Sequence, residues 1–353
     1  MEFQPDFRHM LDVLANRRPA RLPVYEHIVN IPVMEKILGV NFGPLYMGSE
    51  HDLNEFFHHY CRFWQEMTYD TVSYEVCITE ILPGPGALRG GKGPIQTRAD
   101  FERYPWNELE ARYWNLAETK FISLSKNIPS GMTALGGVGN GVFEISEDLV
   151  GFEYLAYMQA DDPELFTWLY AKIGDLMVAI WQRFLAQFGN LFAICRMGDD
   201  LGYKTRTLTS PRNIRQFILP QYQRVSSLIR KSGHPFLWHS CGNIFEVMDE
   251  VIALGINAKH SNEDVIAPFE TWINRYGDRI GLLGGIDVDI LCRSTPADII
   301  DLVYARGRMY RAIAMGYALG SGNSIPDYVP VEGYLAMLEA AKKIRIDEAR
   351  GNL

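Results

Sequence analysis

Four short apolar runs decide the fold: FAICRM (residues 192–197), FLWH (236–239), INAKH (256–260) and IGLLGGI (280–286). Each run is rich in apolar, β-branched or aromatic residues, and longer segments with a helical pattern separate them. Short apolar runs that alternate with helical patterns are typical of repeated β-strand–helix units, which build a parallel sheet. These four runs and the helical segments between them therefore predict an α/β fold.

Further runs extend this alternation toward both ends of the chain. They cover residues 22–28, 71–76, 133–137 and 317–319. Eight strands separated by helices predict a closed (β/α)₈ TIM barrel, with an N-terminal helical extension and long loops in its first half. An open doubly wound sheet is the alternative. No G-x-G-x-x-G motif follows the first run, which argues against a dinucleotide-binding version of that sheet.

The helical patterns fill the spaces between these runs. They cover residues 51–68, 162–188, 210–231, 244–254, 266–276, 296–315 and 331–346. Ser210-Pro211 and Thr295-Pro296 each place a hydroxyl cap before a proline, which predicts helix starts. Residues Met177 and Trp181, four apart, are expected on a buried helix face. Because no Gly/Ser linker or low-complexity run interrupts the chain, residues 1–353 are predicted to form one domain.

Composition excludes several classes of protein. The 353 residues hold 34 Lys+Arg against 43 Asp+Glu, so the formal net charge is −9, which argues against nucleic-acid and anionic-membrane binding. The most apolar long stretch, residues 165–188, contains Lys172, Asp175 and Arg183 and is expected to be a buried helix rather than a membrane span. Residues 1–10 show no secretory pattern, and five scattered cysteines suggest reduced thiols, so a cytoplasmic location is predicted.

In a barrel of this kind, chemistry is expected at the carboxyl ends of the strands. The sharpest signal there is His239-Ser240-Cys241, because residues two apart on a strand point to the same face. An imidazole and a thiolate that converge in this way predict a zinc site with an open coordination position. The alternative is a small buried cysteine and a hydrogen-bonded histidine at a tight turn.

Two further strand ends carry candidate catalytic groups. Asp199 and Asp200 are adjacent carboxylates that could divide the roles of acid and base; alternatively, one caps the next helix and the other is solvated. His260 closes the neighbouring strand and could be a metal ligand, a general base or a structural histidine.

Weaker candidates for substrate binding lie at the other strand ends. They are Glu26, Glu75, Glu144, Asp287 and Asn323. Single glutamates are also common in surface and capping roles. The glycine-rich run at residues 136–141 is expected to form a turn after the third strand. It lacks the Lys-Ser/Thr ending of a phosphate loop, so it predicts only a close approach of the backbone to a ligand.

Several of these segments together resemble the uroporphyrinogen decarboxylase superfamily. They are RLPV (21–24), FLWHSCGN (236–243), YGDR (276–279), GGID (284–287) and GSGNSIPD (320–327). The resemblance spans nearly the whole chain in order. It implies a single (β/α)₈ barrel that is commonly dimeric, so a homodimer is expected.

The resemblance points to two chemistries. True uroporphyrinogen decarboxylases follow the first strand with an arginine-rich segment that holds the carboxylates of the porphyrinogen, whereas residues 25–30 here contain no arginine. Corrinoid-dependent methyltransferases of the superfamily bind zinc through a histidine and a cysteine, which match His239 and Cys241, and a later cysteine, which falls at Asn323. An amide is a poor zinc ligand. Asp200, Glu144 or His260 could complete the site instead.

We therefore expect a methyltransferase that moves a methyl group between a small methylated compound or thiol and a corrinoid. Zinc would act as a Lewis acid, and Asp199 or Asp200 would handle the accompanying proton. The chain has no D-x-H-x-x-G corrinoid-binding segment, so a separate corrinoid protein is the expected partner. The alternatives are a decarboxylase of a tetrapyrrole or smaller carboxylate, with Arg196 or Arg206 holding the departing carboxylate, and a barrel that binds a ligand without turning it over.

Overall fold

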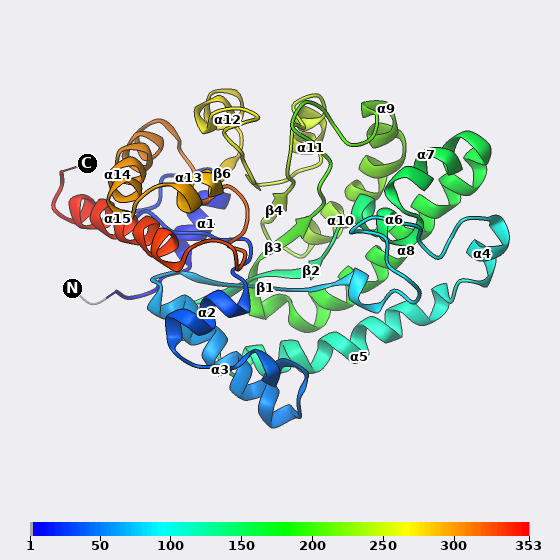
Figure 1. Ribbon diagram of the computed structural model, residues 1–353, viewed down its shortest axis with the longest axis horizontal. Helices are drawn as coiled ribbons and strands as arrows, with labels where there is room; N and C mark the ends of the chain where they lie inside the picture. Colours follow the sequence, from blue (N-terminus) through cyan, green and yellow to red (C-terminus); the bar gives the residue numbers. More distant parts are fainter. Residues whose placement is uncertain (1–2, 353) are drawn as a thin grey trace.

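The computed structural model describes residues 3–352 and contains a parallel sheet of seven strands in the order β1-β2-β3-β4-β5-β6-β7. The strands are β1 (Thr71–Cys77), β2 (Thr133–Gly139), β3 (Phe192–Gly198), β4 (Phe236–His239), β5 (Ala258–His260), β6 (Gly281–Ile286) and β7 (Tyr317–Ser321). Each pairs in parallel with the next along the chain, so all seven carboxyl ends lie at one edge of the sheet. The sheet is curled and helices surround it (Figure 1). The predicted α/β fold is confirmed.

The first predicted strand, residues 22–28, does not form a ladder. It makes an isolated parallel bridge from Val24 to Leu319 of β7. The ladder stops there because both backbone groups of Ser321, the last residue of β7, bond to side chains: its N–H donates to Glu26 and its carbonyl accepts from His260. The prediction of eight strands in a closed barrel is thus confirmed only in part: the described residues form a curled sheet of seven strands, with an extended segment bridged to β7.

The helices that precede β1 are α1 (Arg8–Leu14), α2 (Ile31–Leu38) and α3 (Glu50–Glu66). Those between β1 and β3 are α4 (Arg98–Arg103), α5 (Trp106–Ser125), α6 (Val142–Val150), α7 (Phe152–Asp161) and α8 (Pro163–Phe188). The remaining helices are α9 (Pro211–Asn213), α10 (Leu219–Lys231), α11 (Met248–Ala253), α12 (Phe269–Tyr276), α13 (Val288–Arg293), α14 (Pro296–Ile313) and α15 (Val331–Ala349). The N-terminal extension is therefore helical, as predicted, and helices occupy much of the expected long loops.

Helix boundaries follow from local chemistry. The hydroxyls of Ser210 and Thr295 accept the predicted cap hydrogen bonds from Asn213 N–H and Asp298 N–H. A π-helical turn (Ile214–Ile218) joins α9 and α10 into one long helix. Helix α11 begins later than the predicted residue 244, because Asn243 N–H bonds to the Tyr203 carbonyl across the β3 loop and holds the chain in a turn.

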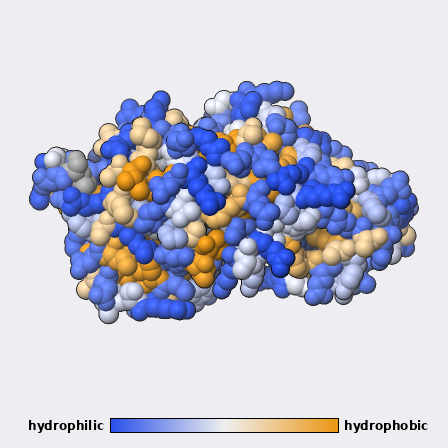
Figure 2. Space-filling view, turned by 90° about the horizontal axis from the view of Figure 1, so that it is seen from above, coloured by the Kyte–Doolittle hydropathy of each residue, from blue (hydrophilic) through white to orange (hydrophobic). Residues whose placement is uncertain are grey.

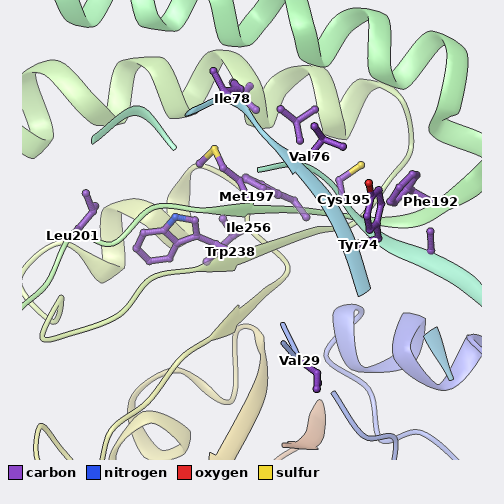
Figure 3. Close-up of a cluster of buried hydrophobic side chains, with 14 of the residues drawn as sticks. Val29, Tyr74, Val76, Ile78, Phe192, Cys195, Met197, Leu201, Trp238 and Ile256 are labelled. Atoms are coloured by element: carbon purple, nitrogen blue, oxygen red, sulfur yellow. The ribbon is translucent and has the colours of Figure 1, made fainter. Parts of the chain in front are cut away.

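The outer face of the sheet packs against the helices through a continuous apolar core. Figure 3 shows part of it, with Val76, Met197 and Trp238 directed from the strands toward the surrounding helices. Met177 and Trp181 on α8 are fully buried in the same core, as their spacing predicted.

A second apolar cluster lies on the inner face of the sheet. It contains Tyr25, Leu135, Ile194, Leu237, Ala258, Leu283 and Ala318, with Met10, Val13 and Leu14 of α1. Val13 lies against Gly281, the first residue of β6, which places α1 at the amino ends of the strands. Helix α1 thus covers the amino ends of the strands on the inner side of the curled sheet.

The glycine-rich run is strand rather than turn, because β2 extends to Gly139. Gly136 and Gly137 have φ angles of +133° and +112°, which other residues rarely adopt. A Cβ atom on Gly137 would lie 2.5 Å from the ring of Phe184 on α8. These two glycines thus allow a close approach of β2 to neighbouring parts of the chain, and the predicted approach to a ligand stays a prediction.

Figure 2 shows one face of the surface, on which hydrophobic side chains gather in several patches among hydrophilic ones. Within residues 3–352, no helix is both long enough and apolar enough to cross a membrane. The five cysteines are all free.

Candidate metal centre

Four of the predicted residues meet at the carboxyl edge of the sheet. His239 ends β4, and its Nε2 atom lies 3.5 Å from Cys241 Sγ and 3.7 Å from Asp200 Oδ1. The Cys241 N–H donates to the same carboxylate oxygen at 2.8 Å. Asn323, which follows β7, donates through Nδ2 to Cys241 Sγ at 3.4 Å. One imidazole, one sulfur and one carboxylate therefore converge on a common point.

These distances suit a zinc ion. Zn–S and Zn–N bonds of ~2.3 and ~2.0 Å at a tetrahedral centre place sulfur and nitrogen about 3.5 Å apart, and Cys241 Sγ and His239 Nε2 show this separation, 3.5 Å. The ligand atoms of Asp200, His239 and Cys241 all lie within 4.8 Å of one another. Three protein ligands leave a fourth position for a substrate, as in catalytic zinc sites. The Asp200 side chain is 41% exposed, so the cluster reaches solvent on that side.

The charges of the cluster also suit a cation. Burial raises the pKa of the Cys241 thiol well above its usual value, and the Asp200 carboxylate adds to the effect. A bound cation reverses this balance and keeps the sulfur deprotonated. The Ser261 hydroxyl and the Asn323 amide both donate to the sulfur at 3.4 Å, an arrangement that favours a thiolate. The backbone of Ser261 has a φ angle of +95°, which is rare for a residue other than glycine.

Two further histidines extend the cluster inward. His239 Nδ1 lies 2.8 Å from His260 Nδ1, and His260 Nε2 donates to the Ser321 carbonyl at 3.0 Å. Burial lowers the pKa of His260 to about 3 and that of His239 well below its usual range, so both rings are neutral at pH 7. The ring of His27 stacks on His239, with centroids 3.9 Å apart and planes inclined by 15°.

Sequence reasoning did not select His27 as a site residue, although a signal was present. Leu237 belongs to the inner apolar cluster, and His239 follows two residues later; Tyr25 belongs to the same cluster, and His27 follows it with the same spacing. Side chains two apart on an extended segment share a face. Ligand atoms of His27, His239 and His260 also lie within 4.8 Å of one another. Because the rings of His27 and His239 are nearly parallel, the two cannot direct lone pairs in their planes at one ion.

The adjacent aspartates have different environments. Asp199 is fully buried and accepts hydrogen bonds from Phe143 N–H and Glu144 N–H, both at 2.9 Å, and from the Tyr222 hydroxyl. It thus binds the amino end of α6, the helix after β2 rather than the next helix in the chain. Burial raises the pKa of Asp199 to about 6, although these hydrogen bonds lower it. Only Asp200 of the pair faces the cluster.

Three of the predicted substrate-binding acids serve local structure. Glu26 is 1% exposed and accepts hydrogen bonds from the N–H and hydroxyl of Ser321, and burial raises its pKa to about 8. Asp287 caps α13. Glu144 accepts hydrogen bonds from Asn140 Nδ2 at 2.9 Å and from Asp200 N–H at 3.3 Å. It therefore contacts the backbone of the residue that supplies the carboxylate of the cluster.

Beneath the histidines lies a buried ion pair. Arg196 is fully buried; its Nη2 atom donates to Glu75 at 2.7 Å, and its Nη1 atom donates to Ser73 Oγ at 2.6 Å and to the Tyr25 hydroxyl at 3.1 Å. These contacts hold the guanidinium on the inner side of the curled sheet. Arg206 is exposed on the loop after β3.

The chain is similar to one protein family in sequence and to several solved structures in fold. The sequence profile of the family described as Uroporphyrinogen decarboxylase (URO-D) matches residues 92–344. Among solved structures, a methyltransferase from Methanosarcina mazei is similar with a TM-score of 0.75 and 15% identity, covering 96% of this chain and 99% of that one. A glycoside hydrolase family 5 enzyme from Prevotella bryantii B14 has a TM-score of 0.44 and 10% identity, covering 94% and 97% of the two chains. No curated protein sequence matches.

Proposed function

The chain belongs to the uroporphyrinogen decarboxylase family, and we propose that it is a methyltransferase of that family. It would move a methyl group between a small methylated compound or thiol and a corrinoid carried by a separate protein. The observation that carries this proposal is the convergence of His239, Cys241 and Asp200 at the open edge of the sheet. The similarity of the fold to that of the methyltransferase from Methanosarcina mazei also supports this proposal. We also propose that residues 1–353 form one barrel domain and that the enzyme is a homodimer, which light scattering can test.

In this proposal three side chains hold the metal. They are His239 through Nε2, Cys241 through Sγ and Asp200 through its carboxylate. Zinc, when bound there, supplies a Lewis acid for an oxygen, nitrogen or sulfur atom of the substrate and favours the thiolate form of a thiol. Ser261 and Asn323 steady the Cys241 sulfur by donating hydrogen bonds to it.

Asp200 has a second task, the transfer of the proton that accompanies methyl transfer. Its Oδ1 atom is held by Cys241 N–H, which leaves Oδ2 to accept a proton from a thiol substrate and pass it to solvent. Asp199 takes no part in this step, because its carboxylate is sealed against the end of α6.

The family description also raises decarboxylation, and the position of Arg196 argues against it. A decarboxylase needs a cation or donor to hold its substrate's carboxylate, whereas Arg196 is buried against Glu75, Ser73 and Tyr25. Residues 25–30, at the carboxyl edge, contribute no arginine. A substrate rich in carboxylates would therefore find no arginine there, and Lys259, which lies near Cys241 and Asp200, already donates to the Ser261 carbonyl.

Metal analysis joined to an activity assay tests the proposal. We expect about one zinc per purified chain, retained in Cys292→Ala and lost in Cys241→Ala; Cys292 is a matched control because it lies on α13, outside the cluster. Methylcobalamin, as a soluble substitute for the corrinoid protein, should lose its methyl group to a small thiol only in zinc-loaded enzyme, followed by the cobalamin absorbance. Zinc content equal in both variants would overturn the metal site. Release of CO₂ from uroporphyrinogen with no methyl transfer would favour the decarboxylase.

A further inference from the structure

A chain of hydrogen bonds runs from β7 to the metal cluster. Glu26 accepts from the N–H and hydroxyl of Ser321, and the Ser321 carbonyl accepts from His260 Nε2. The other ring nitrogen of His260, Nδ1, faces Nδ1 of His239 at 2.8 Å. Every member of this chain is at least nine-tenths buried. Only the far side of the His239 ring, at Nε2, faces Cys241 and Asp200.

The chemistry of the partners decides where each proton lies. A carbonyl oxygen can only accept, so His260 Nε2 carries a hydrogen and donates it to Ser321. His260 is fully buried, and its ring meets the Ser321 carbonyl, the His239 ring and the Tyr25 ring, which carry no negative charge. Burial without a counter-charge disfavours the imidazolium, so Nδ1 of His260 has a lone pair instead of a second proton. The short contact between the two Nδ1 atoms then requires a hydrogen on His239 Nδ1.

This arrangement bears on the proposed function, on which the inference rests in part. We propose that His260 is a positioning residue that holds His239 in the tautomer with its proton on Nδ1, so that the Nε2 lone pair is directed at the metal. A neutral imidazole in water prefers its proton on Nε2, and in that form His239 could not ligate through Nε2. The hydrogen bond to His260 also fixes the orientation of the ring, as partners of metal-bound histidines do elsewhere.

Hydrogen bonds on both sides of Ser321 hold it in place. The Ser321 carbonyl shares a rigid peptide plane with the N–H of Gly322, which donates to the Ile286 carbonyl at 2.6 Å, so the Ser321 carbonyl cannot turn away from His260 without breaking that hydrogen bond. Glu26 holds the N–H and side chain of the same serine in place.

Two near-isosteric substitutions of His260 separate this role from packing. The side-chain oxygen of asparagine reaches the position of Nδ1, so His260→Asn keeps an acceptor for His239 Nδ1–H. The end of a glutamine side chain reaches the position of Nε2, so His260→Gln keeps the contact with Ser321 and lacks the acceptor beside His239. We expect zinc affinity, measured by competition with a chromophoric chelator, to fall by about 10- to 100-fold in His260→Gln and by only a few-fold in His260→Asn. Circular dichroism on both variants reports folding.

Nitrogen NMR of the metal-free protein tests the same inference without zinc. With ¹⁵N-labelled histidine, the wild type and His260→Asn should show the His239 proton on Nδ1, whereas His260→Gln should shift it toward Nε2. A His239 proton on Nε2 in the wild type, or equal zinc affinity of the two folded variants, would overturn the inference. If the wild type binds no zinc, the metal site proposed above and the ligating role of Nε2 both fail, while the spectra still decide the tautomer.

Discussion

At the scale of single residues, neighbours in sequence have separate roles because the strand end turns between them. Asp199 and Asp200 are adjacent, yet one binds the end of α6 and the other faces Cys241. The same holds for the histidines: His239 presents Nε2 to the cluster, whereas both ring nitrogens of His260 lie within the buried hydrogen-bond chain.

The two aspartates should respond differently to the same substitution. In metal-free protein, Asp199→Asn should lower the free energy of unfolding by about 1–3 kcal/mol, because the α6 N–H groups and Tyr222 lose a buried carboxylate acceptor. Asp200→Asn should leave that free energy nearly unchanged and weaken zinc binding. Urea denaturation and zinc titration of each variant measure the two effects. Zinc affinity that falls more in Asp199→Asn would contradict the assignment.

Glu26 should make stability depend on pH. Its pKa rises from an ordinary value of ~4.3 to about 8 in the folded protein, so between these values the folded state binds more protons than the unfolded state. The free energy of unfolding should therefore fall as pH rises through this window, by at most ~1.4 kcal/mol per pH unit from this group.

The variant Glu26→Gln, which can keep both hydrogen bonds to Ser321, should lack this component. The comparison is urea denaturation of both proteins between pH 5 and pH 8, in metal-free buffer. Curves that fall in parallel would show that Glu26 does not titrate in this range.

At the scale of elements, the two ends of the curled sheet have separable tasks. Helix α1 covers the amino ends of the strands, while the cluster lies at their carboxyl ends. The strands connect the two: Leu237 packs in the inner apolar layer and His239, two residues on, enters the site; Ala258 and His260 repeat the pattern.

A cavity under α1 should reduce stability without changing metal binding. Leu14 is buried in the inner layer, so Leu14→Ala should lower the free energy of unfolding by about 2–5 kcal/mol. Leu11 lies on the same helix but is only half buried, and Leu11→Ala should cost clearly less. Thermal and urea unfolding measure the difference, and zinc affinity should stay unchanged in both. Equal losses in the two variants would contradict the covering role of α1.

At the scale of the whole molecule, metal binding and folding are linked. The ligands come from the end of β4 and from the loops after β3 and β4, which converge only in the folded chain. Zinc that binds the folded state alone should raise the free energy of unfolding by about 2.7 kcal/mol at a free concentration 100 times its Kd. Differential scanning fluorimetry should show a higher Tm for zinc-loaded wild type, reversed by chelator, and no zinc-dependent change in Cys241→Ala.

The order of elements could be read from the sequence to a large extent. Seven of the eight predicted strands are present, because buried parallel strands read as short apolar runs. Residues 22–28 were the exception. The apolar pattern does not reveal that the N–H and carbonyl of Ser321 bond to side chains and are therefore not used for strand pairing. Helix α5 was missed although Leu109, Tyr113, Ala117, Phe121 and Leu124 mark its buried face. The π-helical turn between α9 and α10 had no recognisable signal.

The sequence by itself determined the α/β class, the order of seven strands and the chemical types at the strand ends, since periodicity and residue type are local properties. The pairing of His239 with Cys241 followed from the two-residue repeat of a strand. Only the tertiary structure decided which groups join them, because Asp200, Asn323 and His27 approach from three other parts of the chain. It also decided the proton positions, which depend on whether a ring nitrogen faces a carbonyl, a second imidazole or open space. Those are distances between segments far apart in sequence, and the order of residues does not state them.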